Sequence, residues 1–169
     1  MYITAETSNT VSVIDTRANE VSANFLVDVR PRAVAFSPDG HRAYVTTEIG
    51  GTVEVVDVGS HEVIETIPLD VGAKPVDVVV SPDSRWVYVA NGRDNSVAVI
   101  DARRLRVAAT IPVGRRPWGI ALDPSGRRLY TANGLSNDVS IIDTESRRVV
   151  ATVRVGARPW GVAIGFPNP

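Results

Sequence analysis

The chain has 169 residues, of which 44% are hydrophobic and 22% charged, a composition typical of one globular domain. It contains no cysteine, which excludes a disulfide framework and thiol chemistry, and its net charge of −1 argues against a protein built to bind nucleic acid. No apolar run is long enough to cross a membrane, and no signal peptide is expected because strand-like sequence follows Met1 directly.

The charges are unevenly distributed along the chain. Residues 1–100 carry 7 basic and 14 acidic side chains, whereas residues 101–169 carry 11 basic and 5 acidic ones. This difference suits two halves that attract each other, and chance variation of the surface is the alternative.

Short strands are predicted from the first residues onward, and no helical periodicity is visible. Residues 1–30 contain three strand-like runs, "MYITAE", "TVSVIDT" and "EVSANFLV". Residues 31–74, 75–116 and 117–158 each contain four, for example "VDVVV", "WVYVAN", "SVAVIDA" and "RVAATIPV". Such runs of four to eight residues, rich in Val, Ile, Thr and Tyr and bounded by Gly, Pro, Asn and Asp, are typical of strands. Residues 159–169 contain one more, "PWGVAI".

These segments are copies of one unit of about 42 residues. Spacings of 44, 42 and 42 separate the prolines that begin each unit, Pro31, Pro75, Pro117 and Pro159. The same set of intervals, in the order 42, 44 and 42, separates all the tyrosines of the chain, Tyr2, Tyr44, Tyr88 and Tyr130. An aspartate also repeats, as Asp15, Asp57, Asp101 and Asp143. Four strands in 40–45 residues are typical of a β-propeller blade, so an all-β propeller of four-stranded antiparallel blades is predicted.

We denote the strands of a unit A to D in chain order. Residues 1–30 then supply strands B, C and D of one blade, and residues 159–169 supply only a strand A. A terminal strand that completes this split blade would remove two exposed sheet edges. Closure within one chain gives a four-bladed monomer, and exchange between two chains gives an eight-bladed homodimer, which we favour.

The units resemble the YVTN-family β-propeller repeats. The residues that carry this resemblance are "AVAFSPDGHRAYVTTEIGGTVEVVDV", "DVVVSPDSRWVYVANGRDNSVAVIDA" and "GIALDPSGRRLYTANGLSNDVSIIDT". The resemblance implies a propeller of seven or eight blades, a periplasmic or secreted location, and a similarity to accessory proteins of pyrroloquinoline-quinone-dependent alcohol catabolism. Four units are fewer than this family usually has, which suggests half of a larger ring.

The sequence contains no recognisable catalytic constellation. There is no phosphate-binding glycine loop, nucleophile elbow or HExxH motif, so we expect neither enzymatic activity nor a cofactor. The repeated aspartates are expected to cap turns, and the tyrosines to pack between blades. His41 and His61 fall on the same side of one unit, but two histidines without a third ligand make a weak metal site, so we predict none.

The loops between strands D and A carry the candidate binding residues. A cation precedes each unit's proline, at Arg30, Lys74, Arg116 and Arg158. Arg32, Val76, Trp118 and Trp160 follow the prolines, and the B–C loops on the same side add amides that include Asn91 and Asn133. The predicted binding site is thus a ring of positive charge near the channel mouth, formed by Arg30, Lys74, Arg116 and Arg158, with Trp118, Trp160, Asn91 and Asn133 beside it.

Such a ring would concentrate an anionic small molecule or a protein partner, since a cleft lined by one sign of charge focuses its field. Pairing of each cation with a nearby carboxylate, with the indoles filling space between blades, is the structural alternative. The function expected is therefore a non-catalytic scaffold or binding module that self-associates. The alternatives are an engineered or truncated half-propeller that only self-assembles, and a lactonase-like or cofactor-holding enzyme.

Overall fold

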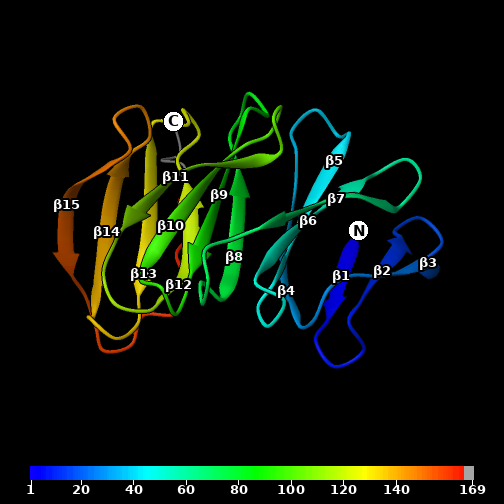
Figure 1. Ribbon diagram of the computed structural model, residues 1–169, viewed down its shortest axis with the longest axis horizontal. Helices are drawn as coiled ribbons and strands as arrows, with labels where there is room; N and C mark the ends of the chain where they lie inside the picture. The colour runs from blue at the N-terminus through cyan, green and yellow to red at the C-terminus, as the bar shows by residue number, and fades with distance from the viewer. Residues whose placement is uncertain (166–169) are drawn as a thin grey trace.

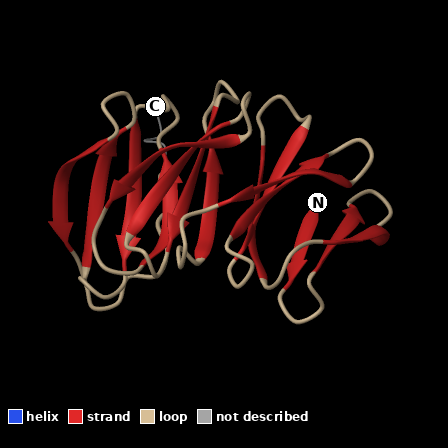
Figure 2. Cartoon of the chain, in the orientation of Figure 1, coloured by secondary structure: helices blue, strands red, loops and turns tan. Residues whose placement is uncertain are grey.

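The computed structural model describes residues 1–165 and consists of four antiparallel sheets arranged side by side in an open arc (Figures 1 and 2). The first sheet has three strands, β1 (Tyr2–Ala5), β2 (Thr10–Asp15) and β3 (Glu20–Leu26). The second has four, β4 (Pro31–Phe36), β5 (Arg42–Thr47), β6 (Thr52–Asp57) and β7 (Glu62–Pro68). The predicted all-β propeller of four-stranded blades, with one blade lacking a strand, is confirmed.

The other two sheets repeat the second one. The third contains β8 (Pro75–Val80), β9 (Trp86–Asn91), β10 (Ser96–Asp101) and β11 (Arg106–Pro112). The fourth contains β12 (Pro117–Leu122), β13 (Arg128–Asn133), β14 (Asp138–Asp143) and β15 (Arg148–Arg154). Each strand pairs with its neighbour in sequence, so every blade is a meander whose A strand forms one edge and whose D strand forms the other.

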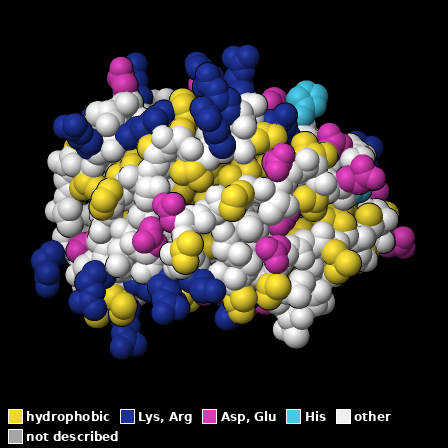
Figure 3. All heavy atoms as spheres, in the orientation of Figure 1, with side chains coloured by type: hydrophobic (Ala, Val, Ile, Leu, Met, Phe, Trp, Pro, Cys, Tyr) yellow, Lys and Arg dark blue, Asp and Glu magenta, His cyan; other side chains and the backbone are white. Residues whose placement is uncertain are grey.

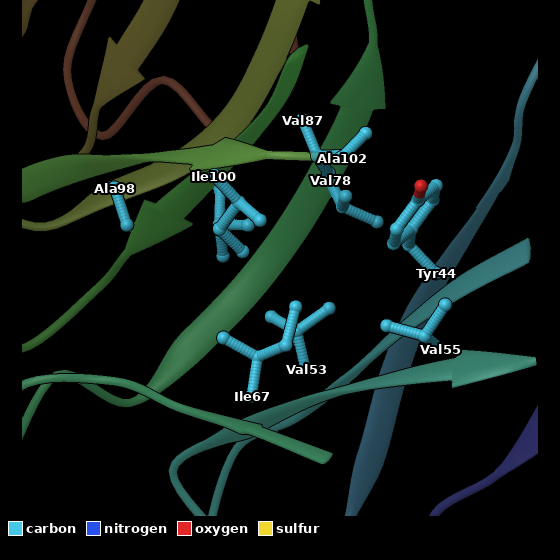
Figure 4. Packing of buried hydrophobic residues seen from close by; sticks show 10 residues of the cluster. Tyr44, Val53, Val55, Ile67, Val78, Val87, Ala98, Ile100 and Ala102 are labelled. Carbon is cyan, nitrogen blue, oxygen red and sulfur yellow. The ribbon is translucent and has the colours of Figure 1, made fainter. Parts of the chain in front are cut away.

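The core lies between the sheets. One cluster of buried side chains joins the second and third sheets (Figure 4). It contains Tyr44, Val53, Val55 and Ile67 from the second sheet, and Val78, Val87, Ala98, Ile100 and Ala102 from the third blade. A similar cluster joins the third and fourth sheets, and it includes Tyr88, Val97, Ile120 and Ile142. Because both faces of an interior blade are covered, the strands read as nearly continuous apolar runs rather than alternating ones.

The A strands form the inner side of the arc. β4 lies against β8 and β8 against β12, whereas β1, a B strand, contacts β4 as β5 contacts β8 and β9 contacts β12. The first and last sheets stand at opposite ends of the longest axis (Figure 1).

The terminal segment differs from the prediction. A strand was expected over 159–169, but residues 159–165 form no strand, and 166–169 lie outside the described residues. A strand requires a partner to satisfy its backbone groups, and the free edge of β1 lies at the far end of the arc. The predicted closure within one chain is therefore not formed, and exchange between two chains stays a prediction.

No helix of the described residues is long and apolar enough to span a membrane.

Candidate functional site

The loops that lead into the A strands hold their cations in an unusual backbone conformation. The residue before each proline is left-handed, with φ of 64° at Arg30, 54° at Lys74, 60° at Arg116 and 52° at Arg158. This region is unfavourable for residues other than glycine, and a following proline restricts the backbone further. The conformation fixes the direction in which each cationic side chain leaves the loop.

Asparagines of the B–C turns stabilise this conformation. The backbone N–H groups of Arg30, Arg116 and Arg158 donate to the side-chain oxygens of the asparagines 21 residues earlier, at 2.9, 2.8 and 2.9 Å. The three acceptors are Asn9, Asn95 and Asn137. The loop that contains Lys74 is two residues longer than its counterparts. Gly51 occupies the position that corresponds to the capping asparagine. A backbone requirement thus accounts for part of the repeated pattern.

A β-bulge follows each of the three prolines that begin a strand. Pro117 pairs with Asn133 and Gly119 with Ala132, so Trp118 is an extra residue in β12. The same shift occurs after Pro31 and Pro75. A bulge redirects a side chain out of the normal alternation. This explains how the residue after the proline reaches the inner side of the arc.

In the second unit the cations are neutralised. Arg30 Nε lies 3.1 Å from Glu6 Oε2 and 3.3 Å from Glu48 Oε2. Arg32 contacts the same two carboxylates, so two arginines and two glutamates form one network. Arg30 therefore pairs with nearby carboxylates, as the structural alternative to a binding site predicted.

In the fourth unit the cations lie among indoles. Trp118 and Trp160 stack with ring centroids 4.4 Å apart and planes at 20°, and the Arg116 guanidinium lies 4.5 Å from the centre of the Trp118 ring. Trp160 and the Arg116 guanidinium are both at stacking distance from Trp118, so they occupy opposite faces of its ring. The outer face of Trp160 is left free, and that side chain is 63% exposed.

Two glycines permit this close packing. A Cβ at Gly134 would lie 2.6 Å from Trp118 Cδ1. A Cβ at Gly119 would lie 2.8 Å from the Trp160 carbonyl oxygen and from Gly161 Cα. The terminal segment therefore lies directly against β12, in the place where the A strand of a following blade would be.

Two hollows adjoin the indole pair. The first, which we name the inner groove, has a volume of about 260 Å³ and is lined by Glu6, Arg32, Val76, Asp77, Trp118, Gly119, Trp160 and Gly161. The second, which we name the indole pocket, has a volume of about 370 Å³ and is lined by Arg116, Trp118, Gly134, Leu135, Arg158 and Trp160. The inner groove contains both signs of charge, whereas the indole pocket contains only arginine charge.

Asp77 is the most buried carboxylate of the inner groove. Its Oδ1 accepts from the backbone N–H of Val78 and its Oδ2 from that of Ile120, both at 2.9 Å. Burial raises the pKa of Asp77, because desolvation outweighs these two hydrogen bonds. The carboxylate thus ties β8 to β12 at the inner side of the arc.

The structure brings together only part of the predicted ring. Arg116, Arg158, Trp118 and Trp160 gather at the indole pocket. Lys74 is partly buried and makes no ion pair among the described residues.

The prediction that Asn91 and Asn133 flank the mouth is wrong. They are 1% and 0% exposed, respectively. The Asn133 amide donates to Asp138 Oδ1 at 2.7 Å and to Ser140 Oγ at 2.9 Å, inside its own blade. Both asparagines end strands whose preceding residues are buried on both faces, such as Val89 and Ala90 before Asn91. The covering of both faces of the blade therefore buries these amides.

The turn-capping role predicted for the repeated aspartates is confirmed. Oδ1 of Asp15, Asp57, Asp101 and Asp143 accepts backbone N–H groups of the following C–D turns. Tyr44 and Tyr88 are buried between blades. His61 Nδ1 lies 2.6 Å from the Tyr2 hydroxyl. Among residues 1–165, no group of three or more His, Cys, Asp or Glu side chains could hold a metal ion.

Sequence reasoning missed Asp77 and the capping asparagines. The constant 21-residue separation from Asn9, Asn95 and Asn137 to the cations is visible in the sequence and identifies the caps. Asp77 is the only charge in "PVDVVV", an otherwise apolar run, which marks it as a residue with a specific partner.

Repeated four-stranded sheets around an inner side lined by A strands define the class of this protein as a β-propeller. Solved structures agree with this assignment. A chain of Kuenenia stuttgartiensis hydrazine synthase superposes with a TM-score of 0.84 at 30% identity, covering 90% of this chain and 45% of that one. A functionally unknown protein from Desulfotomaculum acetoxidans has a TM-score of 0.84 at 20% identity, with 97% and 55% covered.

A third structure, the Myceliophteria thermophila Cps50 (Swd1) β-propeller domain, has a TM-score of 0.79 at 13% identity, with 96% and 58% covered. This chain therefore spans about half the length of the structures that it matches. No curated protein matches the sequence significantly.

The particular family is shown by a sequence model. Residues 22–154 match the family described as "Lactonase, 7-bladed beta-propeller", and the chain belongs to that family.

Proposed function

We propose that this chain is a non-catalytic binding module whose indole pocket binds an anionic small molecule with a flat apolar part. The observation that carries this proposal is the contrast between two copies of one loop. Arg30 is neutralised by Glu6 and Glu48, whereas Arg116 and Arg158 line a pocket without any carboxylate. An anion supplied from outside would complete the second copy as the glutamates complete the first.

The pocket favours a ligand with two parts. Arginine presents forked donors that suit carboxylate or phosphate groups, and the free face of Trp160 presents a flat apolar surface. Trp160 is 63% exposed and stacks on Trp118, and the two indoles with Leu135 give the pocket an apolar wall, a feature of ligand-binding sites.

Calorimetric titration with phenylacetate, gluconate and inorganic phosphate tests the proposal. Phenylacetate is expected to bind most tightly, because it has both the ring and the carboxylate. Replacing Arg116 and Arg158 together by alanine should weaken that binding at least ~10-fold, since hydrogen bonds to charged groups contribute about 1.5–3 kcal/mol. Arg30→Ala is the matched control and should leave the affinity unchanged.

Two results would contradict the proposal. Unchanged affinity in the double variant would remove the arginines from the site. Loss of folding, seen as a collapsed thermal transition in circular dichroism, would show that they serve the structure instead.

Lactone hydrolysis is the second candidate function, and family membership together with Asp77 favours it. A carboxyl of raised pKa in a groove is a candidate acid or base. Both oxygens of Asp77 already accept backbone N–H groups, however, which leaves little capacity to activate water. We therefore expect no hydrolysis of a six-membered sugar lactone above the spontaneous rate. A rate that Asp77→Asn abolishes would establish this alternative.

The finer assignment to YVTN-type repeats, with an association with quinone-dependent alcohol catabolism and a periplasmic location, is also a proposal. Its support is the resemblance of the three full units, in particular "YVANGRDNSVAVID". Fractionation of cells that express the gene in its native context tests the location, and recovery only in the cytoplasm would contradict it.

A further inference from the structure

A polar hollow lies at the end of the third sheet where the A–B and C–D turns meet. We name it the arginine hollow; it has a volume of about 400 Å³ and is lined by Arg85, Trp86, Asp101, Arg103 and Arg104. The indole pocket adjoins a B–C turn, so the two sites lie at opposite ends of the strands. The second and fourth sheets pack against the third one, so both blades that flank the hollow are present.

The strand register assembles the arginine hollow. Trp86 begins β9 and lies opposite Asp101, the last residue of β10. The carbonyl oxygen of Arg85, just before β9, accepts the backbone N–H of Ala102 at 3.0 Å. The two arginines of the C–D turn follow Ala102 directly, so three guanidinium groups and one indole meet at one end of the sheet.

The arginine hollow carries an excess of positive charge. Asp101 is the one carboxylate among its lining residues, and its Oδ2 lies 2.8 Å from Arg104 Nη1. Within residues 1–165, Arg85 and Arg103 belong to no ion pair. Three guanidinium groups against one carboxylate leave two positive charges at the hollow, with most of their N–H donors free for a ligand.

The neighbouring units show that the turn itself does not need these arginines. The counterparts of Arg104 are Ser60 and Ser146, whose hydroxyls donate to the turn aspartates at 3.1 and 2.8 Å. Glycine and glutamate occupy the position of Arg103 in these two units. Serine thus satisfies the turn aspartate elsewhere, and the arginines of the third unit add charge that the fold does not require.

Two further hollows extend the arginine hollow into a depression across three sheets. A hollow of about 580 Å³ between the second and third sheets shares Arg103 with it and contains two carboxylates and two guanidinium groups. A hollow of about 270 Å³ between the third and fourth sheets shares Trp86 with it. We name this last one the acidic hollow, because its described lining contains Asp83 and Glu145 but no arginine or lysine.

The surroundings favour a macromolecular partner. The Arg147 guanidinium, from the fourth sheet, lies 4.5 Å from the centre of the Trp86 ring. Figure 3 shows Lys and Arg side chains gathered along the upper edge of the view, over the turns of the third and fourth sheets. Tryptophan and arginine are the residues that contribute most often to the energetic centre of protein interfaces.

We propose that this depression docks an acidic segment of a partner protein. Two adjacent carboxylates of the segment enter the arginine hollow, where forked guanidinium donors suit them, and a basic side chain beside them meets the acidic hollow. A nucleic-acid strand fits less well, because its phosphates would carry negative charge past Asp83 and Glu145. The site shares no residue with the indole pocket, and either can fail alone.

A titration followed by NMR tests the docking site, with the three indole N–H signals as reporters. The probe is a peptide in which a glycine separates two adjacent glutamates from two adjacent lysines, used in both sequence directions. The Trp86 signal, assigned with Trp86→Phe, is expected to shift at lower peptide concentration than the signals of Trp118 and Trp160. A peptide of the same composition in which glutamate and lysine alternate should bind at least ~10-fold more weakly, since it cannot place two adjacent carboxylates at the arginines.

Variants locate the contact. Arg85→Ala combined with Arg103→Ala should weaken binding of the probe at least ~10-fold, because charge-assisted hydrogen bonds are lost. Both side chains are exposed, so the variant is expected to fold. Arg17→Ala is the matched control, since Arg17 is the counterpart of Arg103 in the first unit, and it should leave the affinity unchanged.

Three results would overturn the proposal. The first is unchanged affinity in the double variant, and the second is equal binding of the two peptide patterns. The third is a shift of the Trp86 signal by oligothymidylate at lower concentration than by the acidic peptide, which would assign the depression to nucleic acid instead.

Discussion

The backbone of Arg116 is left-handed, which costs an L-residue about 1–2 kcal/mol. The hydrogen bond from its N–H group to Asn95 Oδ1 offsets part of that cost and fixes the loop. The cation of the indole pocket is therefore positioned by a residue that does not touch the pocket.

Asn95→Ala is predicted to destabilise the protein by about 1–2 kcal/mol, measured as a lower urea midpoint at constant slope. The variant loses one hydrogen bond and places alanine at φ 58°, a conformation that asparagine tolerates better. Asn95→Gly removes the bond but permits the conformation, as Gly51 does in the second unit, so it should cost less. Equal stability of all three proteins would show that the cap is dispensable.

The lowered pKa values of two turn aspartates lead us to predict a loss of folding stability in acid. The backbone N–H of Arg104 holds the pKa of Asp101 at about 2, and that of Ser146 holds the pKa of Asp143 at about 2, below the usual 3.8. Since folding lowers these values, the stabilisation is complete above about pH 4 and is lost as the pH falls toward 2. The unfolding midpoint should decline over that interval. Carboxyl signals that titrate near 3.8 in NMR spectra of the folded protein would contradict this.

At the scale of single elements, two nearly identical segments adopt different backbone structures. "PWGIAL" forms β12 because β13 lies beside it, and "PWGVAI" forms no strand because nothing pairs with it. Residue spacing therefore predicted where the strands of each blade lie and which prolines begin the units. It could not predict the bulges after three of these prolines or supply a partner for the last strand. The continuous apolar runs before Asn91 and Asn133 could have indicated that both amides are buried. The contact of Asp77 with Ile120 could not be foreseen, because it depends on how closely two blades approach.

Gly119→Ala tests the contact between the terminal segment and β12. The added methyl group would meet the Trp160 carbonyl oxygen at 2.8 Å, so the segment must move and the stack of Trp118 on Trp160 should open. The near-ultraviolet circular dichroism of the indoles is expected to decrease, with a loss of about 1–3 kcal/mol from overpacking. Gly161→Ala is the matched control, because its Cβ would meet nothing within 4 Å. An equal spectral change in both variants would refute the contact.

At the scale of the whole molecule, the arc is a linear array in which a blade's stability depends on its neighbours. β10 is buried along its entire length, whereas β2 and β14 alternate between buried and partly exposed residues. In repeat proteins each unit is stabilised through its contacts with adjacent units, so end units open more readily than interior ones.

Amide hydrogen exchange is therefore predicted to be slowest in β9 and β10 and faster in β2 and β14 at low protein concentration. The interior strands are covered on both faces, whereas the end sheets are covered on one face only, so their amides should exchange through more frequent local opening. Equal protection of β2, β9, β10 and β14 would contradict this dependence on neighbouring blades.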